Sequence, residues 1–114
     1  MAVVQLSWRD NSDNETSFKV YRGTSSPVST SDDHIANITL SGSTWSASEA
    51  STGSAPDVAL TSSANNTGDS VTTGETFVIT YTENTGGNYY YGVSASNAIG
   101  DSDIVTTASV LNVA

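Results

Sequence analysis

This chain of 114 residues contains no cysteine and only three fixed cations, and each of these two shortages excludes a class of protein. Without cysteine there is no disulfide, no thiolate nucleophile and no zinc site of the Cys/His type. The cations Arg9, Lys19 and Arg22 stand against twelve carboxylates, so the net charge is −9. A surface that follows phosphates needs clustered Lys and Arg. We therefore expect no nucleic-acid partner and no anionic membrane partner.

Long apolar runs are also absent. The first residues, "MAVVQLSWRDNS", have neither the basic start nor the apolar stretch of a secretory signal, and no segment reaches the length of a membrane span. If Met1 is the natural start, we expect no export through a signal peptide. High acidity with so little lysine suits solution at high ionic strength, where salt screens self-repulsion.

What the chain does contain is apolar residues that recur with a period of two, which is typical of half-buried strands. "VVQLSW" places Val4, Leu6 and Trp8 on one face, and "FKVYRG" places Phe18 and Val20 on one face. "HIANITLSG" alternates with a shift of phase, which predicts a strand with a bulge. The stretches "ETFVITYTE", "NYYYGVSAS" and "DIVTTASVLNVA" predict three more strands. No segment has a long helical face, so we predict an all-β sandwich in a single domain, residues 1–114.

One long stretch, residues 43–74, departs from this pattern. Only Trp45, Val58, Leu60 and Val71 in it look suited to burial. A structureless loop of that length is unusual in a compact domain. We therefore predict an insertion that forms either a small extra hairpin or a flexible binding loop.

Three stretches together resemble the fibronectin type III domain, an immunoglobulin-like β-sandwich, in its bacterial and viral forms. They are "VQLSWRDNSDNETSFKVYRG", "YTENTGGNYYYGVSASNAIGDS" and the closing strand. The family pattern Tyr-x-Tyr-x-Val-x-Ala-x-Asn-x-x-Gly is matched by Tyr89, Tyr91, Val93, Ala95, Asn97 and Gly100. The resemblance implies that Tyr89 is the tyrosine-corner residue, whose hydroxyl bonds the backbone near the preceding turn.

Two departures from that family matter for function. The family's first strand is missing, because the strand that resembles its second one starts almost at Met1. Backbone groups on this strand are therefore expected to lack partners, unless the 43–74 insertion or another chain covers them. The insertion itself is the second departure, and an added element usually carries a particular function.

Acidic residues in two loops are the candidate metal ligands. The resemblance places both loops at one end of the sandwich, where hard oxygen ligands would hold Ca²⁺; the alternative is that they are solvated turn residues. These acids are Asp10, Asp13, Glu15, Asp101 and Asp103. We expect no other cofactor. A glycosidase pair needs one acid in an apolar setting, and these lie in polar loops, so we expect no enzyme. His34, the single histidine, is interpreted as a surface or strand-start residue.

Candidate interaction residues lie on the strand with the missing neighbour and in the insertion. Trp45 either stacks on a sugar or anchors an interface, or it caps the core beneath the insertion. Val3 and Gln5 lie on the open strand. Arg9 and Arg22 either pair with neighbouring acids or mark a less acidic face that docks on a partner.

These observations predict a non-enzymatic virion structural protein, specifically a capsid decoration or cement subunit outside a phage-type virus. Its partners would be the major capsid protein, other virion proteins and copies of itself. The alternative is a carbohydrate-binding or adhesion module of a larger secreted protein at the cell surface, with glycan as its ligand. A tail or fibre component is a further alternative.

Overall fold

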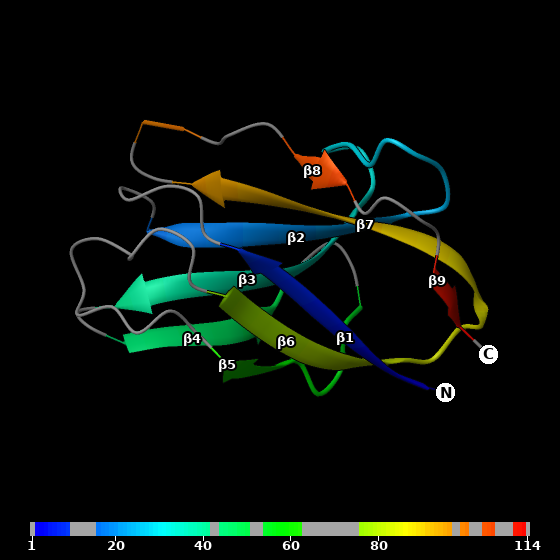
Figure 1. Cartoon of the computed structure of the whole chain (residues 1–114), viewed down its shortest axis with the longest axis horizontal. Helices are drawn as coiled ribbons and strands as arrows, with labels where there is room; N and C mark the ends of the chain where they lie inside the picture. Colours follow the sequence, from blue (N-terminus) through cyan, green and yellow to red (C-terminus); the bar gives the residue numbers. More distant parts are fainter. Residues whose placement is uncertain are drawn as a thin grey trace.

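The computed structural model describes residues 2–9, 16–41, 44–50, 54–62, 76–96, 99–100, 104–106 and 111–113. Within these ranges every regular element is a strand, and all strand pairs are antiparallel. Two sheets pack against each other around one apolar core (Figure 1), which confirms the predicted all-β sandwich. The described residues include no helix with the length and apolar character to cross a membrane.

The smaller sheet has three strands in the order β1-β6-β5. They are β1 (Ala2–Arg9), β6 (Thr76–Glu83) and β5 (Ala59–Ser62). β1 and β6 pair along all eight residues of each strand without a shift of register. The pairing of β5 with β6 is shorter and shifts between Leu60 and Ser62. The sheet therefore has one long regular edge, at β1, and one short irregular edge, at β5.

The larger sheet has the order β4-β3-β2-β7-β8, and β9 pairs with the start of β7. Its strands are β2 (Ser17–Gly23), β3 (Asp33–Ser41), β4 (Thr44–Glu49), β7 (Gly87–Ser96), β8 (Val105–Thr106) and β9 (Leu111–Val113). The bulge predicted from the phase shift is present: Val20 pairs with Ala36 and Tyr21 with His34, so Ile35 has no opposite residue. Ile35 and Ala36 are both fully buried as a result.

The described part of the 43–74 insertion contains two strands, β4 and β5, which add to the sandwich. β4 extends the larger sheet beyond β3, whereas β5 joins the smaller sheet beside β6. The described part of the insertion thus crosses from one sheet to the other. β5 lies on the side of β6 opposite to β1, so neither β4 nor β5 pairs with β1. The closing stretch, predicted as one strand, contributes two short ones, β8 and β9.

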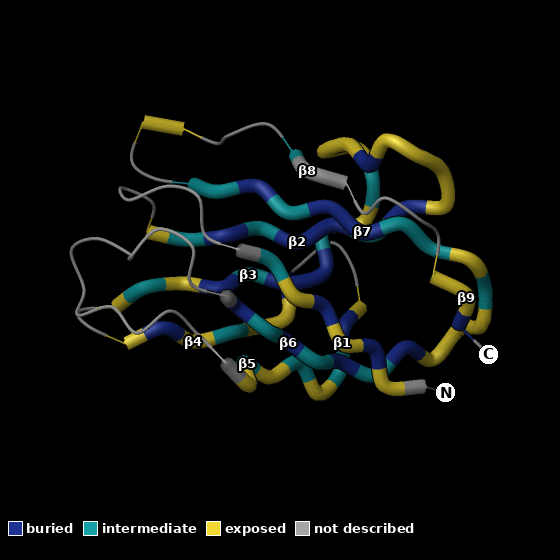
Figure 2. The backbone as a smooth tube through the Cα atoms, viewed as in Figure 1, coloured by how far each residue is buried: buried dark blue, intermediate teal, exposed yellow. Residues whose placement is uncertain are grey.

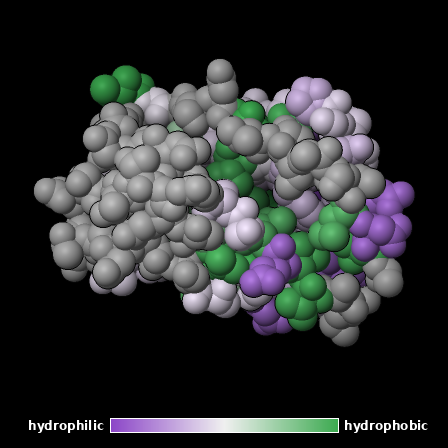
Figure 3. All heavy atoms as spheres, in the orientation of Figure 1, coloured by the Kyte–Doolittle hydropathy of each residue, from purple (hydrophilic) through white to green (hydrophobic). Residues whose placement is uncertain are grey.

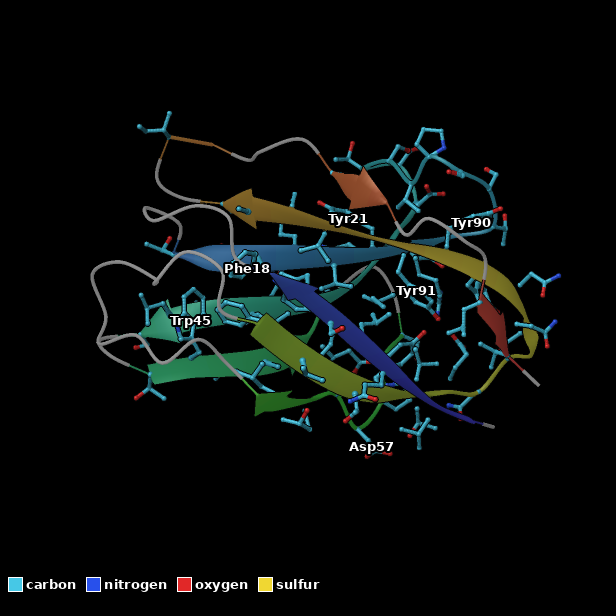
Figure 4. The ribbon with its side chains drawn as sticks, viewed as in Figure 1. Phe18, Tyr21, Trp45, Asp57, Tyr90 and Tyr91 are labelled. Carbon is cyan, nitrogen blue, oxygen red and sulfur yellow. The ribbon has the colours of Figure 1, made fainter. Side chains whose placement is uncertain are left out.

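An aromatic cluster fills one half of the core. Ring centroids lie 4.8 Å apart for Phe18 and Phe77, 5.0 Å for Trp45 and Phe77, and 5.7 Å for Trp8 and Phe77. The rings come from β1, β2, β4 and β6, so they join both sheets. Figure 4 labels Phe18 and Trp45, the two rings of the larger sheet. Each such ring buries about 150–250 Å². In a chain with few apolar residues these side chains contribute much of the core, and Figure 2 shows buried positions on strands of both sheets.

Candidate functional site

The candidate interaction residues on β1 lie where the alternation predicts. Val4 and Leu6 are buried, whereas Val3 is 73% exposed and Gln5 is exposed. The yellow and dark blue segments of β1 in Figure 2 follow this alternation. Arg9 ends the strand. Among the described strands only β6 pairs with β1, so on the opposite side of β1, here named the β1 edge, no described strand is paired.

The β1 edge differs from the other sheet edges of the described chain. β5 has four residues and an irregular ladder, and β8 has two residues. β4 has six residues and carries Glu49, whose carboxylate accepts a hydrogen bond from the Ala55 N–H at 2.6 Å. Proteins usually protect edge strands by shortness, bulges, charge or proline. β1 has eight residues in regular register, with no charge and no proline from Ala2 to Trp8.

From Val3 to Ser7 the outward face of the smaller sheet beside this edge also consists of uncharged residues. On β1 and β6 the ladder pairs Val3 with Thr82, Gln5 with Thr80 and Ser7 with Val78. The described residues over the course of β1 in Figure 3 include many apolar ones (green). At the margin of this face, away from β1, the Thr82 hydroxyl donates to Asp57 at 3.3 Å. On a chain with a net charge of −9, the uncharged run from Ala2 to Trp8 forms a distinct surface.

Arg22 lies inside the sandwich and pairs with acids, the first of the two alternatives for this residue. Its guanidinium donates to Glu83 at 2.5 Å and to Asp33 at 2.9 Å, and its side chain is 11% exposed. It also lies 5.3 Å from the centre of the Tyr89 ring. Burial works against the charge, but the hydrogen bonds and the Glu83 carboxylate outweigh it and raise the Arg22 pKa. Through these two ion pairs the guanidinium links β2, which carries Arg22, to β3 and to β6.

Two tyrosine hydroxyls extend this polar network between the sheets. Tyr81 on β6 donates to Glu83 at 2.9 Å, and its oxygen lies 2.7 Å from that of Tyr91 on β7. Burial is the main cause that raises the pKa of both tyrosines, and the Glu83 charge adds to it. Sequence reasoning missed Glu83. The signal was its parity, because it shares the inward face of β6 with Phe77 and Tyr81.

The tyrosine-corner contact expected for Tyr89 is present. Its hydroxyl donates to the Thr85 carbonyl oxygen at 3.0 Å, four residues upstream. Beside it a pocket of about 170 Å³ opens to solvent, which is smaller than the usual site for a small organic ligand, about 300–1,000 Å³. Its lining is polar and consists of Arg22, Gly23, Thr24, Ser31, Asp32, Asp33 and Tyr89. Since Arg22 is already held by Glu83 and Asp33, this pocket offers little free charge.

Trp45 belongs to the core and is 8% exposed. Its ring packs against Phe18 at 5.6 Å and against Phe77 at 5.0 Å. The indole N–H groups of Trp8 and Trp45 are buried and have no hydrogen-bond acceptor among the described residues. The contacts that the structure gives Trp45 are internal, and an intermolecular role for it stays a prediction.

The five predicted metal ligands, Asp10, Asp13, Glu15, Asp101 and Asp103, lie outside the described residues. Ser17 pairs with Ser96, so the two loops that carry these acids leave the larger sheet from neighbouring strand ends. Within the described ranges no three His, Cys, Asp or Glu side chains gather as a metal site would require. His34 lies at the start of β3, as predicted, and its ring stacks on Tyr21 at 4.9 Å.

Comparison of the chain with protein-family models, with curated proteins and with solved structures found no match.

Proposed function

We propose that this chain is a non-enzymatic assembly module, and specifically a virion structural protein that decorates the outside of a phage-type capsid. The observation that carries this proposal is the β1 edge, which is long, regular and uncharged from Ala2 to Trp8. An added strand on such an edge gains backbone hydrogen bonds without needing a large apolar patch. The edge is therefore suited to assembly with another polypeptide.

The resemblance to fibronectin type III domains supports the specific form of the proposal. Phage-type viruses use immunoglobulin-like and fibronectin-like domains on capsids and tails. The two antiparallel sheets and the Tyr89 hydroxyl bond agree with a domain of this kind. Many symmetric copies on a shell would multiply a modest affinity at each contact. The acidic, hydroxyl-rich remainder of the surface would face the solvent.

The test is co-sedimentation of the purified chain with virus particles that lack it. We expect saturable binding at micromolar concentration. Particles that already carry the protein serve as the control, because their sites are occupied and they should take up no more. If the deficient particles bind nothing at micromolar concentration, the capsid proposal is wrong.

The alternative function, a glycan-binding module, would contact the sugar through Trp45 and the end loops, and the position of Trp45 gives it little support. That indole is 8% exposed and packs between Phe18 and Phe77. A sugar stacks on an exposed aromatic face, which this ring does not present.

A further inference from the structure

The β1 edge has the properties of a strand that is paired when the protein is assembled. From Ala2 to Trp8 it carries no charge, no proline and no bulge, and it is the longest edge strand of the described chain. Exposed strands of this kind are templates for pairing with another chain. A soluble protein would be expected to block such an edge unless a partner covers it.

We infer that the occupant of the β1 edge is β1 of a second copy of this chain, paired antiparallel across a two-fold axis. The two three-stranded sheets then join into one sheet of six strands, with the order β5-β6-β1 followed by β1-β6-β5 of the second copy. Such an interface is isologous, so each copy contributes the same surface. This inference deepens the proposed assembly function and rests on it for its biological purpose.

The alternation of β1 determines the register of this pair. Directly opposite residues must lie on the same face of the joined sheet, so an exposed residue faces an exposed one. The uncharged run from Ala2 to Trp8 is centred on Gln5. The greatest overlap of this run therefore places Gln5 opposite Gln5 of the second copy, and Val3 opposite Ser7. The two glutamine amides can hydrogen-bond to each other, because each has a donor and an acceptor.

The distribution of charge favours this antiparallel arrangement. The first acidic residues of the chain, at 10–15, follow the end of β1. In an antiparallel pair the acidic segments of the two copies leave from opposite ends of the joined strands. In a parallel pair they would leave from the same end and repel each other. The uncharged outward faces of β1 and β6 would lie side by side in the joined sheet.

A charge-swap experiment tests this inference. A residue close to the two-fold axis lies opposite the same residue of the second copy. Gln5→Lys and Gln5→Glu should therefore each place two like charges opposite each other. In sedimentation velocity we expect the wild-type chain to dimerise as its concentration rises. For each variant we expect the dissociation constant of the dimer to be higher, by up to about fivefold. An equal mixture of the two variants should recover the association as a heterodimer. Ser46→Lys and Ser46→Glu, on the exposed face of edge strand β4, are matched controls and should dimerise like wild type.

Three outcomes would overturn the inference. The wild-type chain may be a monomer up to about 1 mM, a range in which even weak specific pairing is detected. The Gln5 variants may dimerise as well as wild type, or their mixture may fail to recover. Hydrogen exchange on the isolated monomer tests whether the chain covers its own edge. Slow exchange of the backbone amides along all of β1 would mean that it does, and this result would also overturn the inference. None of these results depends on virus particles, so particle binding without dimerisation, or the reverse, distinguishes this inference from the proposed function.

Discussion

Arg22 donates to two carboxylates that differ mainly in their exposure to water. The side chain of Glu83 is 5% exposed, whereas that of Asp33 is 57% exposed. Water screens the Asp33 pair, and pairs of this kind contribute about 0–1 kcal/mol. Loss of one partner from a buried pair costs about 3–5 kcal/mol, because the other charge is left without compensation.

We therefore expect Glu83→Gln to destabilise the fold far more than Asp33→Asn does. The expected losses in the free energy of unfolding are about 3 kcal/mol or more for Glu83→Gln and below about 1 kcal/mol for Asp33→Asn. Urea unfolding of the two variants beside wild type measures both values. Equal losses would show that burial does not distinguish the two contacts.

Gly92 is a position where the packing leaves no room for a side chain. A Cβ at this position would clash with Ile104 Cγ2 and would lie 3.2 Å from Val28 Cβ. Val28 and Ile104 thus lie directly over β7, on the face turned away from the core, and leave no room for a methyl group.

The expected result of Gly92→Ala is a loss of about 1–3 kcal/mol in the free energy of unfolding, from overpacking. The double variant with Ile104→Ala should lose less than the sum of the two single changes, because it removes the clashing atom. A thermal or urea unfolding cycle of the four proteins measures this coupling. Additive losses would place the cause elsewhere than in this contact.

At the scale of elements, β6 and β7 are joined across the sandwich by the hydroxyls of Tyr81 and Tyr91, 2.7 Å apart. Burial raises the pKa of both groups above the ordinary value of about 10. Above about pH 10 the unfolded chain has released these protons and the folded chain has kept them. The contribution of these two tyrosines to the stability of the fold is therefore complete below about pH 10 and is lost as the pH rises further.

We expect the free energy of unfolding to fall above about pH 10, at up to about 1.4 kcal/mol per pH unit for each of the two tyrosines. Urea unfolding at a series of alkaline pH values measures the slope. In Tyr81→Phe the slope should be smaller, because one of the two groups is gone. The tyrosinate absorbance of folded protein should show Tyr81 and Tyr91 as the last to ionise. If the free energy of unfolding does not change above about pH 10, the folded chain does not keep these protons longer than the unfolded chain does.

The strands could be predicted from the sequence wherever one face is apolar. Apolar residues alternate on β1, as Val4 and Leu6 do, and on β2, as Phe18 and Val20 do, and the same period marks β6 and β7. A period of two is the spacing of a half-buried strand. The path of β4 and β5 could not, since a short strand such as "ALTS" carries little pattern and its partner is chosen by tertiary packing. The inward position of Glu83 could be predicted from its parity on β6, but its pairing with Arg22 could not, because partners 61 residues apart leave no local signal.

The whole molecule carries a net charge of −9, and this charge is expected to oppose the compact state. Raising NaCl from about 0.01 M to about 1 M shortens the screening length from about 30 Å to about 3 Å. We expect the melting temperature to rise by several degrees over this range. Sodium chloride is the appropriate salt, because sulfate stabilises proteins by exclusion whatever their charge. A melting temperature that falls with NaCl would mean that favourable ion pairs outweigh the self-repulsion.

The pairing of β1 with β6 also determines when the first strand finds its place during synthesis. Arg9, at the end of β1, pairs with Thr76, and Ala2 pairs with Glu83. At a translation rate of about 5–20 residues per second, β1 exists for several seconds before β6 has been made. During that time both of its edges are open and nothing in the run from Ala2 to Trp8 repels a neighbouring nascent chain. The strand suited to assembly is thus also the part of the newborn chain that most needs protection from premature association.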